Sequence, residues 1–145
     1  MAVRKRADER GQATVELMAV LPVLLAVAVV TVNALLFFSD CAAFNRLARQ
    51  AVRVHACSPA YGQDAQESRA LVQAELDRAF ERDNISTTVA VEEAAGGRLV
   101  FRATLEFSPT LFGMGLRTEA FGVALPKAAH TVSYTVDRYK PGVVV

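Results

Sequence analysis

The longest apolar run in the chain covers residues 17–38, which are 22 positions without a charged side chain. A helix rises about 1.5 Å per residue, so a run of this length crosses a bilayer core of about 30 Å. Four basic residues, Arg4, Lys5, Arg6 and Arg10, precede the run. Because cationic flanks stay in the cytoplasm, the pattern predicts a single-pass membrane protein with a cytoplasmic N-terminus and an extracytoplasmic C-terminal part.

The helix is expected to continue beyond the apolar run, through residues 39–57. Apolar side chains recur there at helical spacing, at Phe44, Leu47, Ala48, Ala51 and Val52. The polar side chains Arg46, Arg49, Gln50 and Arg53 fall on the opposite face, which suits either a solvated surface or a contact with lipid headgroups or another subunit. Pro59 and Gly62 are expected to end the helix.

A second helix is predicted over residues 64–82. Asp64 can cap its first turn, and Glu67 stands three residues later, as in a capping box. The apolar positions form one stripe, which should cover one face of a sheet; they are Leu71, Val72, Leu76, Ala79 and Phe80.

Apolar and polar residues then alternate over residues 85–92 and 98–107, which predicts a β-hairpin. A two-residue Gly-Gly turn would pair Val91 with Arg102 and mix the two faces. A loop with an odd number of residues, such as 95–97, pairs Val91 with Phe101 and keeps the apolar face continuous.

The segment after the hairpin is predicted from weaker signals. Residues 108–116 resemble a Pro/Gly loop whose apolar side chains either anchor it to the domain or contact another subunit. Alternation over residues 117–125 and 130–139 predicts two further strands around Pro126. In the last strand, Val132, Tyr134 and Val136 share one face.

These elements predict an α+β fold with a long N-terminal transmembrane helix and a small domain of one helix packed on an antiparallel sheet. Residues 1–11 form a cytoplasmic basic leader, and residues 12–57 form the long helix with its span at about 17–38. Residues 58–145 form the extracytoplasmic domain. Although 52% of the residues are hydrophobic, the span raises that share, so a rich soluble core is not implied.

The distribution of charge and the lack of catalytic or ligand-binding motifs reduce the number of possible functions. The net charge is +1, with four bases and two acids in residues 1–11 and 12 bases and 13 acids in the remainder. Such a near-neutral exterior argues against nucleic-acid binding, which needs a concentrated basic face. No catalytic set, nucleotide loop or metal-ligand spacing is visible in the sequence, so no enzyme activity, cofactor or metal is expected.

The junction between the leader and the span reads G-Q-A-T-V-E, residues 11–16. A carboxylate inside a membrane costs about 2.5–3.5 kcal/mol at the centre and less near the interface. Glu16 is therefore either at headgroup depth, where it costs little, or it serves a partner.

A basic leader that ends in Gly11, with Glu16 five residues later and an apolar helix beyond, resembles the processing site of type IV pilins. The sequence R-G-Q-A-T-V-E-L with Pro22 soon after is similar to the TadE-like minor pilins of tight-adherence (Flp) pilus systems. The resemblance is specific over about residues 11–56, and only general over the α+β part.

The resemblance implies that a prepilin peptidase cleaves between Gly11 and Gln12. Gly11 would let the backbone enter the peptidase without a Cβ clash. The new ammonium group on Gln12 would then pair with the Glu16 carboxylate of a neighbouring subunit, an interaction that gains most when desolvated and hydrogen-bonded. Implied partners are membrane lipid, the peptidase, and other pilin and tight-adherence assembly subunits.

Two other interpretations of the apolar run remain. An uncleaved anchor would keep the leader, and Pro22 would kink its helix, as membrane helices tolerate. Alternatively, Ala26-Val27-Ala28 could be a signal-peptidase site, although the apolar run continues ten residues beyond it. That cleavage would release a soluble secreted binding domain.

Cys41 and Cys57 are the only cysteines. On one helix their Cα atoms would be about 24 Å apart, beyond the limit of about 7 Å for a disulfide. We therefore expect free thiols or an interchain disulfide, because an intrachain bond would need a break in the helix. His55 and His130 are interpreted as ordinary packing or surface residues.

Overall fold

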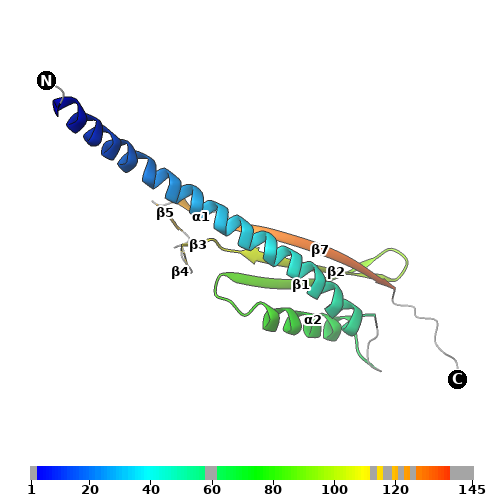
Figure 1. Cartoon of the computed structure of the whole chain (residues 1–145). Helices are drawn as coiled ribbons and strands as arrows, with labels where there is room; N and C mark the ends of the chain where they lie inside the picture. Colours follow the sequence, from blue (N-terminus) through cyan, green and yellow to red (C-terminus); the bar gives the residue numbers. More distant parts are fainter. Residues whose placement is uncertain are drawn as a thin grey trace. The chain divides into compact units, whose positions relative to one another are not determined.

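The computed structural model describes the backbone of residues 3–57, 62–111, 114–115, 119–120, 123–124 and 127–137, and the side chains of residues 14–57, 62–110 and 127–137. The chain divides into two compact units, Met1–Leu36 and Phe37–Val145 (Figure 1). The described residues of the first unit are helical, and the second unit holds the α+β domain. The predicted α+β class, with a long apolar helix before a small helix and an antiparallel sheet, is confirmed at this level.

Helix α1 (Val3–His55) contributes residues to both units. It contains Pro22 and ends two residues before the predicted boundary, with Arg53 and His55 in its last turn. Basic side chains at this end of a helix interact favourably with its free carbonyl groups. Pro59 lies outside the described residues, and Gly62 has a φ of 82°, which suits glycine.

Helix α2 (Ala65–Ala79) begins with the predicted capping box. The backbone N–H of Glu67 donates to Oδ1 of Asp64 at 2.7 Å, and the N–H of Asp64 donates to Oε2 of Glu67 at 3.2 Å. The helix ends three residues earlier than predicted, because Phe80 leaves helical geometry at φ −115° and ψ 38°. Phe80 thereby enters the core before the chain turns into the first strand.

Three long antiparallel strands form the main sheet in the order β1-β2-β7 (Figure 1). They are β1 (Ile85–Ala94), β2 (Arg98–Phe107) and β7 (Ala128–Asp137). Val91 pairs with Phe101, as the parity argument predicted, and the loop has three residues. Gly96 and Gly97 adopt φ values of 81° and 71° in that loop, which side chains with a Cβ rarely adopt.

The segment between β2 and β7 differs from the prediction. Residues 117–125 do not form one strand; β5 (Glu119–Ala120) and β6 (Val123–Ala124) pair with each other instead. Alternation alone overlooked the turn signal of Gly122 between them. The predicted loop over residues 108–116 contains the short pair β3 (Thr110–Leu111) and β4 (Met114–Gly115), and its remaining apolar residues lie outside the described ones.

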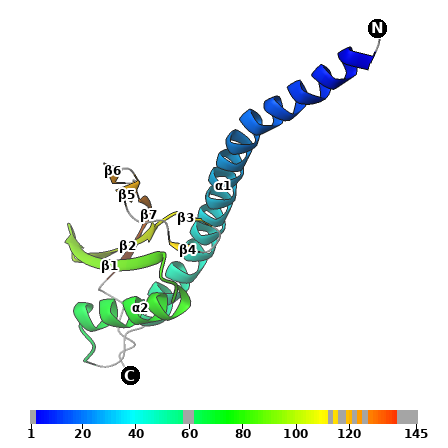
Figure 2. The ribbon, with the colours of Figure 1, turned by 90° about the vertical axis from the view of Figure 1, so that its left-hand side faces the viewer.

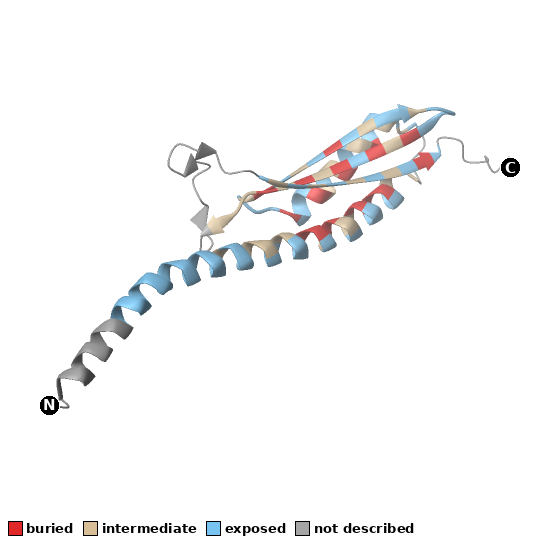
Figure 3. Cartoon of the chain, turned by 90° about the horizontal axis from the view of Figure 1, so that it is seen from above, coloured by how far each residue is buried: buried red, intermediate tan, exposed pale blue. Residues whose placement is uncertain are grey.

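The core lies between one face of the main sheet and two helices, the α1 segment from residue 37 onward and α2. Figure 2 shows α2 beside β1, and Figure 3 shows the buried positions gathered where the helices face the strands. Alternate residues of β2 supply the centre of this core, and the last strand adds Val132, Tyr134 and Val136 on the same face, as predicted. The β2 residues are Leu99, Phe101, Ala103, Leu105 and Phe107.

Two leucines of α2 provide a matched test of this core. Leu76 is 0% exposed and Leu71 is 44% exposed. We predict that Leu76→Ala lowers the free energy of unfolding by about 2–5 kcal/mol, because it leaves a cavity under the sheet. Leu71→Ala should cost about 1 kcal/mol or less. Denaturant unfolding of the full chain in detergent measures both, and equal losses would contradict the packing described here.

Candidate functional site: the apolar helix and the polar residues beside it

The first functional feature is the apolar surface of α1 within the first unit. Its large apolar side chains are exposed from Val15 to Leu36 (Figure 3). The described residues contain one helix that is long and apolar enough to cross a membrane, and only 6% of its most apolar window is buried. An apolar surface of this size requires cover, because patches beyond a few hundred Å² are rare on soluble monomers.

The polar side chains within this apolar stretch are satisfied inside the helix. Oγ1 of Thr31 donates to the carbonyl of Val27 at 2.8 Å, and Nδ2 of Asn33 donates to the carbonyl of Val29 at 2.9 Å. Such back-bonding to residue i−4 allows a polar side chain to sit in an apolar medium without an unpaired donor. These two polar residues are therefore compatible with a membrane span.

The predicted processing residues lie near the start of α1. Gly11 and Gln12 belong to its helical backbone, while the side chain of Gln12 lies outside the described residues. Glu16 is exposed and lies four residues after Gln12 in the sequence. Pro22 lies inside the helix. Cleavage after Gly11 and the assembly role of Glu16 stay predictions.

The two cysteines have different environments, and both are free thiols. Cys41 is buried, three residues beyond the predicted span, and burial together with the negative charge of Asp40 raises its thiol pKa. Cys57 follows the end of α1 and is partly exposed. The interchain disulfide stays a prediction, and the burial of Cys41 favours Cys57 as the thiol that could form one.

An ion pair that the sequence analysis did not foresee ties α1 to the segment before β1. Asp40 is 8% exposed, and its Oδ1 accepts a hydrogen bond from the guanidinium group of Arg82. The other oxygen, Oδ2, is buried and has no hydrogen-bond partner among the residues that the structure describes. A buried carboxylate is costly without its counter-ion. The position of an acid directly after the apolar run is the only sequence signal for it.

We predict that Arg82→Ala destabilises the domain by about 1–3 kcal/mol, because it leaves the Asp40 carboxylate buried and unpaired. The guanidinium group is half exposed, so screening by solvent keeps the loss below that of a fully buried pair. Denaturant unfolding measures the effect, and Arg78→Ala in the last turn of α2 is the control.

A double-mutant cycle separates this pair from general surface effects. In an Asp40→Ala background the cost of Arg82→Ala should fall to a few tenths of a kcal/mol, because no buried charge remains to be left unpaired. An undiminished cost in that background would show that Arg82 acts through other contacts.

Asn45 joins α1 to the last strand. Its Oδ1 accepts from Nε2 of His130 at 2.9 Å, and its backbone carbonyl accepts from the hydroxyl of Tyr134 at 3.0 Å. Phe44 packs edge-on against the His130 ring, with 6.4 Å between ring centroids. His130 therefore contacts α1 through Asn45 and Phe44, and α1 is held at a defined position along β7.

His55 makes the corresponding contact at the end of the helix. Its Nε2 lies 2.9 Å from Oε2 of Glu75 on α2. His55 thus makes a polar contact between the end of α1 and α2.

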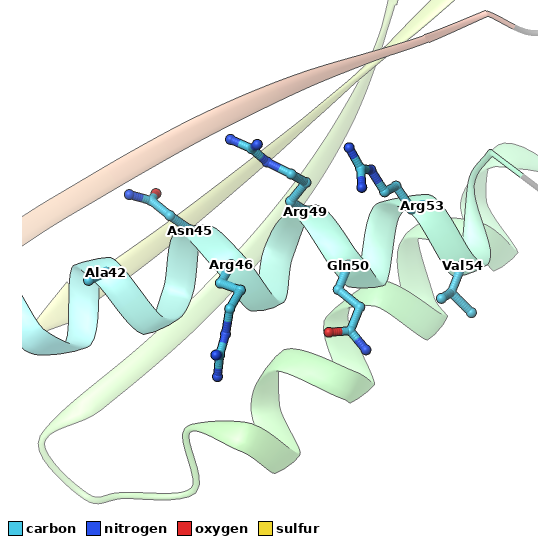
Figure 4. Close-up of a pocket in the computed structure, with 7 residues that line it drawn as sticks. All are labelled: Ala42, Asn45, Arg46, Arg49, Gln50, Arg53 and Val54. Carbon is cyan, nitrogen blue, oxygen red and sulfur yellow. The ribbon is translucent and has the colours of Figure 1, made fainter.

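The outward face of α1 carries exposed arginines. Arg46, Arg49 and Arg53 are exposed, and none of them pairs with a carboxylate within the described part of the chain. A cavity of about 610 Å³ lies among their side chains (Figure 4). Its lining residues are Ala42, Asn45, Arg46, Arg49, Gln50, Arg53 and Val54. This cavity is shallow, and its three arginines give it a positive charge that suits acidic groups.

No protein-family model, curated protein or solved structure matches this chain. Its function must therefore be inferred from the apolar helix, the residues at its start and the domain that it helps to build.

Proposed function

We propose that this chain is a membrane-anchored, pilin-like minor subunit of the TadE-like class, which acts in the assembly of tight-adherence pili. A prepilin peptidase removes residues 1–11 at the cytoplasmic surface. Residues 17–38 hold the mature chain in the membrane, and the α+β domain faces the extracytoplasmic side. The chain has no enzymatic role in this proposal.

The observation that carries the proposal is the exposed apolar helix directly behind the Gly11–Glu16 motif. Apolar side chains cover this part of α1 on all sides and are exposed. A plain anchor would explain that surface, but it would not explain a glycine before the cut and a carboxylate one turn later. The small α+β domain after the helix is also of the kind that the resemblance implies.

The proposed assembly step uses two charges on one helix end. Cleavage leaves an ammonium group on Gln12, and the Glu16 carboxylate of the neighbouring subunit neutralises it. Each charge alone is costly in lipid, whereas a hydrogen-bonded pair costs much less. The pair therefore favours subunits whose helices lie side by side in the correct axial position.

Cleavage can be tested by co-expression with a prepilin peptidase, followed by measurement of the intact mass. We predict a mature chain that begins at Gln12. Gly11→Leu should abolish cleavage because the added side chain clashes in the peptidase, while Gly11→Ala, the smallest change, should be cleaved at least partly. A chain that keeps Met1, or one that begins at Val29, would contradict the proposal.

The role of Glu16 can be separated from cleavage. We predict that Glu16→Ala leaves the Gln12 start unchanged but lowers incorporation into sheared pili at least tenfold, because the Gln12 ammonium group loses its counter-charge. The measurement is the ratio of the protein in the pilus and membrane fractions. Glu81→Ala in the domain is the matched control and should incorporate normally. Normal incorporation of Glu16→Ala would remove the assembly role.

A second candidate function is an uncleaved single-pass protein whose extracytoplasmic domain binds a partner. The observation in its favour is the exposed arginine-bearing surface of α1 around Arg46, Arg49 and Arg53, which assembly through the span does not use. Retention of Met1 beside an active peptidase would favour this function.

A further inference from the structure

The two edge strands of the main sheet, β1 and β7, have different neighbours. Side chains of α2 form hydrogen bonds with the backbone of β1 at its outer edge. Nε2 of Gln73 donates to the carbonyl of Thr87 at 3.0 Å, and Oε1 of Gln73 accepts from the N–H of Val89 at 2.7 Å. Arg69 adds a hydrogen bond to the carbonyl of Val89 at 3.3 Å. The Gln73 amide thus occupies the place of a neighbouring strand, which protects this edge from further pairing.

The opposite edge, along β7, is open within the described residues. β7 is the last strand of the three-stranded sheet, and no other described element pairs with it. It runs for ten residues in unbroken register with β2. The strand contains neither proline nor lysine, and Asp137 at its end carries its only formal charge. The features that usually block an edge strand are therefore missing from β7.

The alternation of the sheet shows which β7 groups face outward. Thr87 and Val89 of β1 turn their backbone groups toward Gln73, so the even-numbered residues of β1 pair with β2. The even-numbered residues of β2 therefore form backbone hydrogen bonds with β1, and its odd-numbered residues form them with β7. In the register of β2 with β7, the odd-numbered residues of β2 stand opposite the even-numbered residues of β7. The N–H and C=O groups of Thr131, Ser133 and Thr135 therefore point to the open edge.

Two arginines of α1 lie on the flank of the helix that faces β7 (Figure 4). Asn45 contacts His130 and Tyr134 of β7. Arg49 and Arg53 follow Asn45 at intervals of four residues, on the same flank of the helix. Figure 4 shows their side chains on the β7 side of α1, whereas Arg46 points the other way. Both are exposed, with no carboxylate partner among the described residues.

We propose that the β7 edge binds an extended acidic segment of a partner protein, which adds to the sheet as a fourth strand. Its backbone would pair with the outward groups of β7, as in β-strand addition. Its side chains on the helix side would be carboxylates that contact Arg49 and Arg53. This binding surface is independent of the proposed cleavage at Gly11.

The spacing of the two partners agrees with this geometry. Arg49 and Arg53 are one helical turn apart, about 6 Å along the axis. Side chains two residues apart on one face of a strand are separated by about 6.8 Å. A segment with the pattern acid-x-acid therefore fits both arginines at once. A second copy of β7 does not fit, because its strand has a carboxylate at Asp137 alone.

Synthetic peptides test the two parts of the proposal separately, with the full chain in detergent micelles. The probes are a labelled Thr-Glu-Thr-Glu-Thr-Glu-Thr peptide, its lysine counterpart, and two N-methylated forms, one methylated at the Glu amides and one at the Thr amides. We expect the acidic peptide to bind at least tenfold tighter than the lysine peptide by fluorescence anisotropy. One N-methylated form should lose binding at least tenfold and the other should keep it, since only one set of amides faces β7.

Variants locate the site on the protein. Arg49→Ala with Arg53→Ala should weaken binding of the acidic peptide at least tenfold, whereas Arg46→Ala should change it less than twofold. Ser133→Pro removes one outward N–H without touching the pairs with β2, and should also weaken binding. Circular dichroism of each variant confirms that the domain is folded, and the N-methylated peptides test the backbone contact on the unchanged protein.

Three results would overturn the proposal. Equal binding of both N-methylated forms and the acidic peptide would show simple charge attraction. Failure of the acidic peptide to bind would remove the site. A dimer that Ser133→Pro abolishes and that excludes the peptide would assign the edge to a second copy instead.

Discussion

The exposed apolar surface of α1 is the constraint on which the rest of the molecule depends. The large apolar side chains from Leu17 to Leu36 are mostly exposed, and the polar side chains Thr31 and Asn33 donate hydrogen bonds back to the helix. Such a surface is stable in lipid and unstable in water. It follows that the domain folds around the C-terminal part of a helix whose preceding part is long and apolar enough to cross a membrane.

The same helix changes character where the domain begins. From Phe44 onward one face is buried and the other is polar, and Ala48 and Ala51 are fully buried. Phe44 lies between Phe80 and His130, with its ring edge-on to both. The C-terminal part of α1 is thus a structural element of the domain. Removal of residues 37–55 would expose the inner face of the sheet.

Local patterns in the sequence predicted the local structure well. The capping box at Asp64, the alternation in β1 and β2, and the odd hairpin loop follow from residue spacing and turn chemistry alone. The side-chain contacts that hold these elements together could not be predicted from residue spacing or turn chemistry. Asp40 meets Arg82 across 42 residues, and Asn45 meets His130 across 85 residues. Hydrophobic periodicity contains no information on such side-chain pairs.

The closed edge of β1 was missed for a related reason. Gln73 lies on the polar side of a predicted amphipathic helix, where a solvent-exposed role is the default. Only the packed structure shows that its amide replaces a strand. The processing motif is the reverse case, because Gly11 and Glu16 are singled out by sequence resemblance, while the structure describes only the helix on which they lie.

The most direct test of the account is the intact mass of the protein isolated from its native cell envelope. The account predicts a membrane-bound chain that lacks residues 1–11 and begins at Gln12. A membrane-bound chain that begins at Met1 would contradict it and would leave an ordinary single-pass anchor with an extracytoplasmic domain.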